Sequence, residues 1–463
     1  MNKAMIPVVL LFISVKALAF PIDLDNLVLI KPETVGMSSY ELLKLDEVVK
    51  KYISADTIQG AVLAVSRYGK PVHFQAYGVA DDSKGSPMRR NSMFQMMSST
   101  KPVLGVGSMI AVERGLFSPQ DEVQKYIPGF KDIEVAVLKR RDFSPKFVWT
   151  EPGKEIGFFT RMAGELIGRF TGSYMMHIPE HRAVSADRPV TIHDLLTHTA
   201  GVGTYGLGTA VSGLGAVMGN KTEFVNSDHT LETFVDFVAE ALLDFQPGMR
   251  WMYSGTIGLD VVARIIEITS GQPFNVFVQE NIFNPLDMRD THWWQDSPLE
   301  KQSRLVVRPD SGVKDKGKKI DAATTEKARE SRYYSGSVGL VSTARDYLHF
   351  EQMLVNGGQL LGNRVLKESS VELMSTNQIG DLFGRNGKGK PGGEGFGYTV
   401  SVTLDPNAAM MPRSKGAFGW AGAFGTISWT EPKTQMAVVL MVQQPTKNFP
   451  YEIAKVLSDA IID

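Results

Sequence analysis

Ser98 and Lys101 lie three residues apart, a spacing at which two side chains could share one chemical task. On a helix, residues three apart lie on the same face, close enough to form a hydrogen bond. A serine hydroxyl is a weak nucleophile that needs a neighbouring base, and a buried lysine amine can accept its proton. The same spacing recurs at Ser311 and Lys314, so spacing alone is weak evidence for catalysis.

The residues that follow distinguish the two candidate pairs. Ser98 precedes an apolar stretch with helical spacing that ends near Gly115, whereas Ser311 lies in a charged, polar run. Pro102 falls in the first turn of the predicted helix, where a missing N–H costs little. Ser98 is therefore expected at a helix N-terminus, where N–H groups favour a developing oxyanion. Without further motifs, a simple helix cap beside a solvated lysine would be the better interpretation.

Four segments, in chain order, resemble the serine β-lactamase-related hydrolases. This group contains class C β-lactamases, penicillin-binding DD-peptidases and family VIII carboxylesterases, and the last have the most similar motif pattern. The segments are residues 94–102, 191–201, 335–343 and 419–426. The resemblance spans nearly all of the mature chain. It implies an α/β fold of the β-lactamase/transpeptidase type, with an antiparallel sheet flanked by helices, and a mostly helical inserted domain.

The second element of this family is Tyr-x-Asn, and Tyr253-Ser254-Gly255 occupies its place. The resemblance implies that Tyr253 stands near Ser98 and Lys101 and passes protons between nucleophile and leaving group. Core packing beside Trp251 is the alternative. Gly255 replaces the Asn whose amide, in β-lactam-processing members, binds the acylamino side chain of the substrate.

The third element is a Lys-Thr-Gly-type triad on an edge strand, and two alignments are open. One places residues 417–419 there and the other Trp420-Ala421-Gly422; neither supplies a lysine, and Lys415 lies two residues too early. A charge-assisted hydrogen bond to a substrate carboxylate is worth about 1.5–3 kcal/mol, so its loss favours an uncharged substrate. Trp420 is assigned equally to an acyl-pocket wall or to the core.

The resemblance and these departures from it together predict a serine carboxylesterase that works through an acyl-Ser98 intermediate. The predicted catalytic residues are Ser98, Lys101 and Tyr253, and the N–H groups of Ser98 and Ala423 form the oxyanion hole. Gly255, Trp420 and Gly422 are the expected substrate contacts. A β-lactamase or DD-peptidase, a non-catalytic penicillin-binding-like protein and an acyltransferase remain open as alternatives. The expected partner is a small-molecule ester or amide; the oligomeric state is left open.

Composition excludes several other classes of function. The 463 residues contain no cysteine, which excludes disulfides, thiolate metal sites and a cysteine nucleophile. A formal net charge of -1 gives no basic field for nucleic acid. The His177–His181 pattern suits zinc only on a helix, which Pro179 disfavours, so a surface loop is expected there and neither metal nor cofactor is predicted. In the families this chain resembles, His198 has a structural place near the site.

The pattern of the remaining chain predicts the elements that must position these residues. A helix is expected from Ser39, a hairpin joins strands at 61–66 and 72–77, and residues 380–397 are expected to be an exposed, glycine-rich loop. Three strands and a closing helix are expected near the C-terminus, and the ranges are 398–404, 426–430, 436–442 and 453–461. The predicted division is an α/β domain from 20–116 and 333–463, with residues 117–332 as the mostly helical inserted domain.

The N-terminus has the pattern of a secretion signal. Lys3 precedes an apolar run from Ile6 to Val15, and Ala17-Leu18-Ala19 offers a cleavage site before Phe20. About ten apolar residues are too few to cross a bilayer, which needs roughly twenty, and no later segment is long enough. Residues 1–19 are therefore predicted to be a signal peptide of a periplasmic or secreted enzyme with no membrane span in the mature chain.

Overall fold

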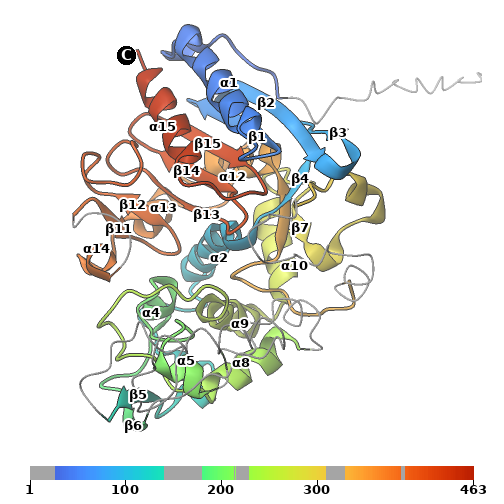
Figure 1. Ribbon diagram of the computed structural model, residues 1–463. Helices are drawn as coiled ribbons and strands as arrows, with labels where there is room; N and C mark the ends of the chain where they lie inside the picture. The colour runs from blue at the N-terminus through green and yellow to red at the C-terminus, as the bar shows by residue number, and fades with distance from the viewer. Residues whose placement is uncertain are drawn as a thin grey trace, which may run out of the picture.

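An antiparallel sheet built from both ends of the chain dominates the upper part of the molecule (Figure 1). The computed structural model describes residues 27–139, 180–212, 214, 229–308, 329–386 and 392–462. In sheet order the eight strands are β11 (Glu394–Phe396), β12 (Ser401–Thr403), β13 (Phe418–Ala421), β14 (Ile427–Glu431), β15 (Met436–Met441), β1 (Gly60–Arg67), β2 (Lys70–Asp81) and β3 (Ser86–Pro87). Leu63 of β1 pairs with Leu440 of β15, so the first and last strands of the chain are neighbours.

Helices cover both faces of this sheet. Every residue of β1 is buried, and its side chains alternate between two cores, as a strand's period of two requires. Leu63 and its same-face neighbours pack against α1 (Ser39–Ser54) and α15 (Phe449–Asp459). Val62 and Ala64 face the opposite core, which contains α12 (Ala344–Val355). The predicted α/β fold with helices flanking an antiparallel sheet is thus confirmed.

The first helix and the hairpin form where they were predicted because local signals determine them, although β2 is longer than the predicted strand at 72–77. The Ser38 hydroxyl accepts a hydrogen bond from the Glu41 N–H and caps α1 at the expected residue. The hairpin between β1 and β2 turns at Tyr68 and Gly69, which have φ values of 50° and 70°. Two consecutive positive φ angles give the turn that suits the right-handed twist of paired strands.

The prediction of an exposed loop at 380–397 is wrong. The described part of this range contains α14 (Leu382–Asn386) and strand β11, and the side chains of Phe383 and Phe396 are buried against Trp251. Glycine density suggested a loop, but these two phenylalanines find apolar partners more than 100 residues away in the sequence. Strand β12 is shorter than the predicted strand at 398–404, and α15 ends before Ile461.

Further helices and small sheets complete the regular elements of the described chain. The helices are α2 (Lys101–Glu113), α4 (Ile192–Leu196), α5 (Leu207–Val211), α8 (Leu231–Ala239), α9 (Gly258–Ser270), α10 (Phe274–Val278) and α13 (Glu368–Ser375), with a π-helix at Gln279–Phe283. The 3-10 turns are η1 (Pro32–Val35), η2 (Asp82–Lys84), η3 (Met97–Thr100), η4 (Val123–Lys125), η5 (Pro128–Phe130), η8 (Trp294–Asp296) and η9 (Leu299–Arg304). The small sheets are β4 (Met93–Gln95) with β8 (Leu340–Thr343) and β7 (His292–Trp293), β5 (Glu134–Leu138) with β6 (His181–Ser185), and β9 (Gln359–Leu360) with β10 (Asn363–Arg364).

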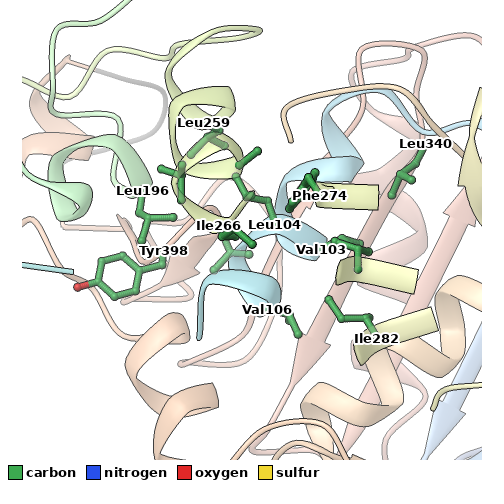
Figure 2. Close-up of a cluster of buried hydrophobic side chains, with 14 of the residues drawn as sticks. Val103, Leu104, Val106, Leu196, Leu259, Ile266, Phe274, Ile282, Leu340 and Tyr398 are labelled. Atoms are coloured by element: carbon green, nitrogen blue, oxygen red, sulfur yellow. The ribbon is translucent and has the colours of Figure 1, made fainter. Parts of the chain in front are cut away.

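Helix α2 runs through the centre of the molecule, between the sheet and the helices α4, α8 and α9 (Figure 1). Its residues from Lys101 to Ala111 are all buried. Figure 2 shows Leu104 and its neighbours among Leu259 and Ile266 of α9 and Phe274 of α10. Because a helix packed on all sides is held from every direction, the residues at its N-terminus have fixed positions.

The predicted insertion contains helices α4, α5, α8, α9 and α10, but also strands β5, β6 and β7. Strand β7 pairs with β8, which belongs to the second half of the predicted α/β domain. The domain boundaries at 116/117 and 332/333 stay predictions. The proposed signal peptide, residues 1–19, lies outside the described residues. Within the part that the structure describes, no helix has the length and apolar content needed to cross a bilayer.

Candidate active site

Ser98 lies where strand β4 ends and the central helix begins. Met97 before it has φ of 47°, a conformation that residues with a Cβ rarely adopt. The backbone is held there from two sides, because the Met96 N–H donates to the Leu340 carbonyl at 2.8 Å and the Tyr347 hydroxyl donates to the Ser99 carbonyl at 2.5 Å. Ser98 is 9% exposed, so its hydroxyl is nearly buried in a rigid strand-to-helix turn.

The Lys101 side chain is fully buried and has three oxygen acceptors. Its Nζ lies 3.3 Å from the Ser98 Oγ, 2.6 Å from the Gly255 carbonyl and 2.9 Å from the Ser337 carbonyl. Three acceptors match the three donors of an ammonium group. A neutral amine has only two N–H donors, and the two carbonyls take both, which leaves its lone pair facing the Ser98 hydroxyl.

Tyr253 completes the predicted trio in space. The Lys101 Nζ lies 5.2 Å from the centre of the Tyr253 ring, and the Trp420 indole N–H donates to the Tyr253 hydroxyl at 3.3 Å. The ring centres of Tyr253 and Trp420 are 5.5 Å apart. A serine, a lysine and a tyrosine from two distant stretches of sequence therefore meet beside the start of α2.

Of the two alignments of the third element, the one containing Trp420 meets the site. Ala417 and Phe418 of the other alignment are buried in the core, whereas Trp420 is half-buried and contacts Tyr253. Lys415 is exposed in the loop before β13.

Gly422 allows the β13–β14 turn to lie against the segment that carries Ser98. A Cβ at Gly422 would stand 2.2 Å from the Met96 carbonyl oxygen, which no side chain could tolerate without a shift of backbone. Thr426 adds to this junction, because its hydroxyl donates to the same Met96 carbonyl at 3.1 Å and lies 3.0 Å from the Ser99 hydroxyl. Ala423 follows in the turn and is exposed. Its role in an oxyanion hole stays a prediction.

His198 is a neutral structural residue behind Tyr253. It is fully buried, and its ring centre lies 4.9 Å from that of Tyr253. Its Nδ1 accepts a hydrogen bond from the Ser254 N–H at 3.4 Å. Burial, with a smaller effect of the nearby Lys101 charge, holds the pKa of His198 well below its usual value. The His198 ring therefore contacts the backbone of the segment that carries Tyr253.

Sequence reasoning gave no role to Asp260 or to the segment that it binds. The Asp260 carboxylate is fully buried on α9 and accepts hydrogen bonds from the Tyr333 hydroxyl, the Ser335 hydroxyl at 2.9 Å and the Ser337 N–H at 2.9 Å. Burial raises the pKa of Asp260 to about 6. The available signal was a single acid between Leu259 and Val261 in an otherwise apolar helical run.

The surface loop expected at 177–181 is only partly within the described residues. His181 begins strand β6 and pairs with Leu138, so it lies neither on a helix nor in the expected loop; His177 lies outside them. Among the residues that the structure describes, no group of three His, Cys, Asp or Glu side chains is placed to hold a metal ion.

Comparison with known proteins gives a family match and relatives with different activities. A family model described as Beta-lactamase matches residues 45–460. Esterase EstB of Burkholderia gladioli is 26% identical over 437 residues, which cover 90% of this chain and 94% of EstB. A putative D-alanyl-D-alanine carboxypeptidase of Salmonella typhi is 22% identical over 469 residues, which cover 96% of this chain and 92% of the relative.

Solved structures share the fold. EstCE1, described as a hydrolase with promiscuous acyltransferase activity, superposes with a TM-score of 0.64 at 21% identity and covers 90% of this chain and 98% of its own. At this identity the similarity shows the architecture alone.

Proposed function

The chain belongs to the beta-lactamase family of serine hydrolases, and from that premise we propose that it is a carboxylesterase acting through an acyl-Ser98 intermediate. The observation that carries the proposal is the position of Lys101. Its nitrogen lies 3.3 Å from the Ser98 Oγ while two backbone carbonyls accept from it. That arrangement supports a lysine base for a serine nucleophile.

The proposed reaction moves one proton through the trio. Ser98 Oγ attacks the ester carbonyl, and its proton passes to the lone pair of Lys101, which becomes an ammonium held by the two carbonyls. The N–H groups of Ser98 and Ala423 bind the resulting oxyanion. Tyr253 delivers a proton to the departing alkoxide, which leaves as the alcohol, and the Lys101 ammonium returns a proton to Tyr253. Water then loses a proton to Lys101 as its oxygen attacks the acyl carbon. That proton passes to the Ser98 Oγ as the acyl–oxygen bond breaks, so the carboxylic acid leaves and Ser98 is restored.

The departures from the β-lactam-processing pattern favour an ester over a β-lactam or a peptide. Gly255 offers no side-chain amide, and Trp420 stands where a substrate-binding lysine would be expected, which suits an uncharged acyl or alcohol group. An alkoxide also leaves more readily than an amine. The esterase relative EstB supports this choice, whereas the carboxypeptidase relative keeps a β-lactamase or DD-peptidase as the second candidate.

Turnover of a panel of nitrophenyl esters of rising acyl length, measured beside a chromogenic cephalosporin, tests the proposal. We expect ester hydrolysis that falls at least about 10³-fold in Ser98→Ala, since the nucleophile is lost. Ser311→Ala is the matched control, because Ser311 has the same spacing to a lysine, and it should keep full activity. Hydrolysis of the cephalosporin but of no ester would favour the second candidate. A serine-reactive phosphonate that fails to label Ser98 would favour a binding protein.

We also propose export of the enzyme to the periplasm or the medium. The apolar run and cleavage site before Phe20 support it. Sequencing the N-terminus of the protein recovered from those fractions should give a chain that starts near Phe20. A cytoplasmic protein that retains its first 19 residues would contradict export.

A further inference from the structure

Asp260 occupies an unusual place for an acid in the first turn of a helix. Acids there commonly interact with the N–H groups of their own helix. The oxygens of Asp260 instead accept from three groups on a separate segment, Tyr333, Ser335 and Ser337. The carboxylate therefore holds that segment against α9.

A single residue joins this carboxylate to the candidate base. The Ser337 N–H donates to Asp260 at 2.9 Å, and the Ser337 carbonyl accepts from Lys101 at 2.9 Å. The second carbonyl at Lys101, that of Gly255, belongs to the segment that enters the same helix, where the Gly258 N–H donates to the Ser254 hydroxyl at 2.8 Å. The start of α9 thus fixes both carbonyl acceptors of Lys101.

We propose that Asp260 is a positioning residue that holds the Ser337 carbonyl at Lys101 and whose buried negative charge sets the pH range in which Lys101 can accept the Ser98 proton. This inference rests on the proposed function, since it assigns a partner to the same base. Asp260 touches neither the nucleophile nor the other reacting groups of the proposed mechanism, so its effect passes through Lys101.

The charges and titratable groups around Lys101 agree with this role. Tyr253 lies beside Lys101, neutral His198 lies behind Tyr253, and Tyr333 binds Asp260 from the side of the 333–337 segment. Burial raises the pKa of Asp260 to about 6, while the hydrogen bonds from the 333–337 segment and, to a smaller extent, the nearby Lys101 charge oppose that rise. Above this pH Asp260 is a carboxylate, which places a buried negative charge behind the Ser337 peptide that binds Lys101.

Removing this charge should change the pH profile in a defined direction. In Asp260→Asn the buried negative charge behind the Ser337 peptide is absent, so the acid limb of kcat/KM for a nitrophenyl ester should move to lower pH. The plateau of kcat should fall, because an amide cannot satisfy all three donors, while KM changes little.

A control variant separates this effect from simple loss of stability. Asp346→Asn removes another buried carboxylate, in the first turn of α12, whose pKa is also raised to about 6 and which binds the Asp290 N–H rather than the Lys101 acceptors. Asp346→Asn should leave the acid limb at its wild-type pH, whatever it does to the melting temperature.

The outcomes distinguish the inference from the proposed function. An acid limb in Asp260→Asn that coincides with wild type, or an equal movement in Asp346→Asn, would overturn the inference while ester turnover stands. If Asp260→Asn does not fold, Tyr333→Phe provides the test, since weakening the Asp260 network must lower kcat without raising KM; an unchanged kcat would refute it. The rate at which a phosphonate labels Ser98 gives the same pH profile even if no ester is turned over, and no labelling of wild type would reject the proposed function itself.

Discussion

The indole N–H of Trp420 donates a hydrogen bond to the phenolic oxygen of Tyr253 at 3.3 Å. A residue of the third motif is thereby joined directly to a residue of the second. The indole presents an apolar face together with one N–H donor. The proposed esterase function therefore assigns Trp420 two roles, which are to favour an uncharged substrate and to orient the Tyr253 hydroxyl.

Trp420→Phe should lower kcat about three- to tenfold with little change in KM. The variant keeps an aromatic wall but loses a hydrogen bond worth about 0.5–1.5 kcal/mol. Steady-state kinetics on a nitrophenyl ester measure the effect. Trp429→Phe is the control, because the Trp429 indole binds Glu431 at 3.0 Å inside the sheet core and should affect stability alone. A loss confined to KM would mean that Trp420 only binds substrate.

Gly422→Ala should reduce kcat at least tenfold without unfolding the protein. Its new Cβ would stand 2.2 Å from the Met96 carbonyl, which forces the β13–β14 turn away from the segment that carries Ser98. The proposed oxyanion donors would then separate, and such a donor is worth several kcal/mol. Kinetics and a thermal melt should be measured together.

Gly107→Ala provides the matched control for that substitution. It adds the same methyl group to α2, where the nearest atoms are 3.9 Å away. Alanine also suits a helix better than glycine, so this variant should melt slightly higher and keep wild-type kinetics. An undiminished kcat in Gly422→Ala would show that the β13–β14 turn does not contribute to the oxyanion hole.

Features that depend on a few neighbouring residues could be predicted from the sequence, whereas contacts between residues far apart in the chain could not. The cap at Ser38, the hairpin turn at Gly69 and the Ser98–Lys101 spacing act over a few residues, and the structure has them as predicted. Phe383 and Phe396 are different, because their burial depends on Trp251, which only the folded chain brings near. Local glycine content could not reveal that contact.

The residues of the candidate site also differ in whether the sequence could reveal them. The position of Tyr253 beside Lys101 followed from the family resemblance and not from spacing, since more than 150 residues separate them. Asp260 escaped notice because a lone acid in an apolar helix does not indicate its partners. Those partners, Ser335 and Ser337, lie 75 and 77 residues further along the chain. Buried hydrogen-bond networks of this kind have no local sequence signature.

Gly255→Asn should raise activity toward esters that carry an acylamino group relative to plain esters. A Cβ at Gly255 would lie 3.6 Å from the Tyr205 hydroxyl and 3.7 Å from Tyr253 Cε1, so a side chain fits without displacing either. An added amide hydrogen bond should change the ratio of kcat/KM values about two- to tenfold. Gly255→Ala, which adds the Cβ without the amide, should leave the ratio unchanged. Equal ratios in both variants would show that this position does not face the acyl group.

In Glu351→Gln the side chain at 351 should contribute the same amount to the free energy of unfolding at every pH, because an amide does not titrate. Glu351 is fully buried on α12, where it accepts from the Thr430 hydroxyl at 2.6 Å, and burial raises its pKa from 4.5 to about 7. The folded protein therefore holds this proton more tightly than the unfolded chain. The stabilisation from the protonated form is complete below pH 4.5 and is lost as pH rises through 7, up to about 3 kcal/mol.

Urea unfolding of wild type and Glu351→Gln at pH 5 and pH 8 measures this loss. Wild type should lose stability relative to the variant between those two values, because only wild type must bury a carboxylate at pH 8. The pH dependence should have the opposite sign for Glu452→Gln. In wild type the hydrogen bond from Lys51 lowers the pKa of Glu452, so the stability that Glu452 contributes is present above the unfolded pKa and is lost as pH falls. If the free energies of unfolding of wild type and Glu351→Gln keep a constant difference from pH 5 to pH 8, the carboxyl at 351 does not titrate in that range and the prediction is wrong.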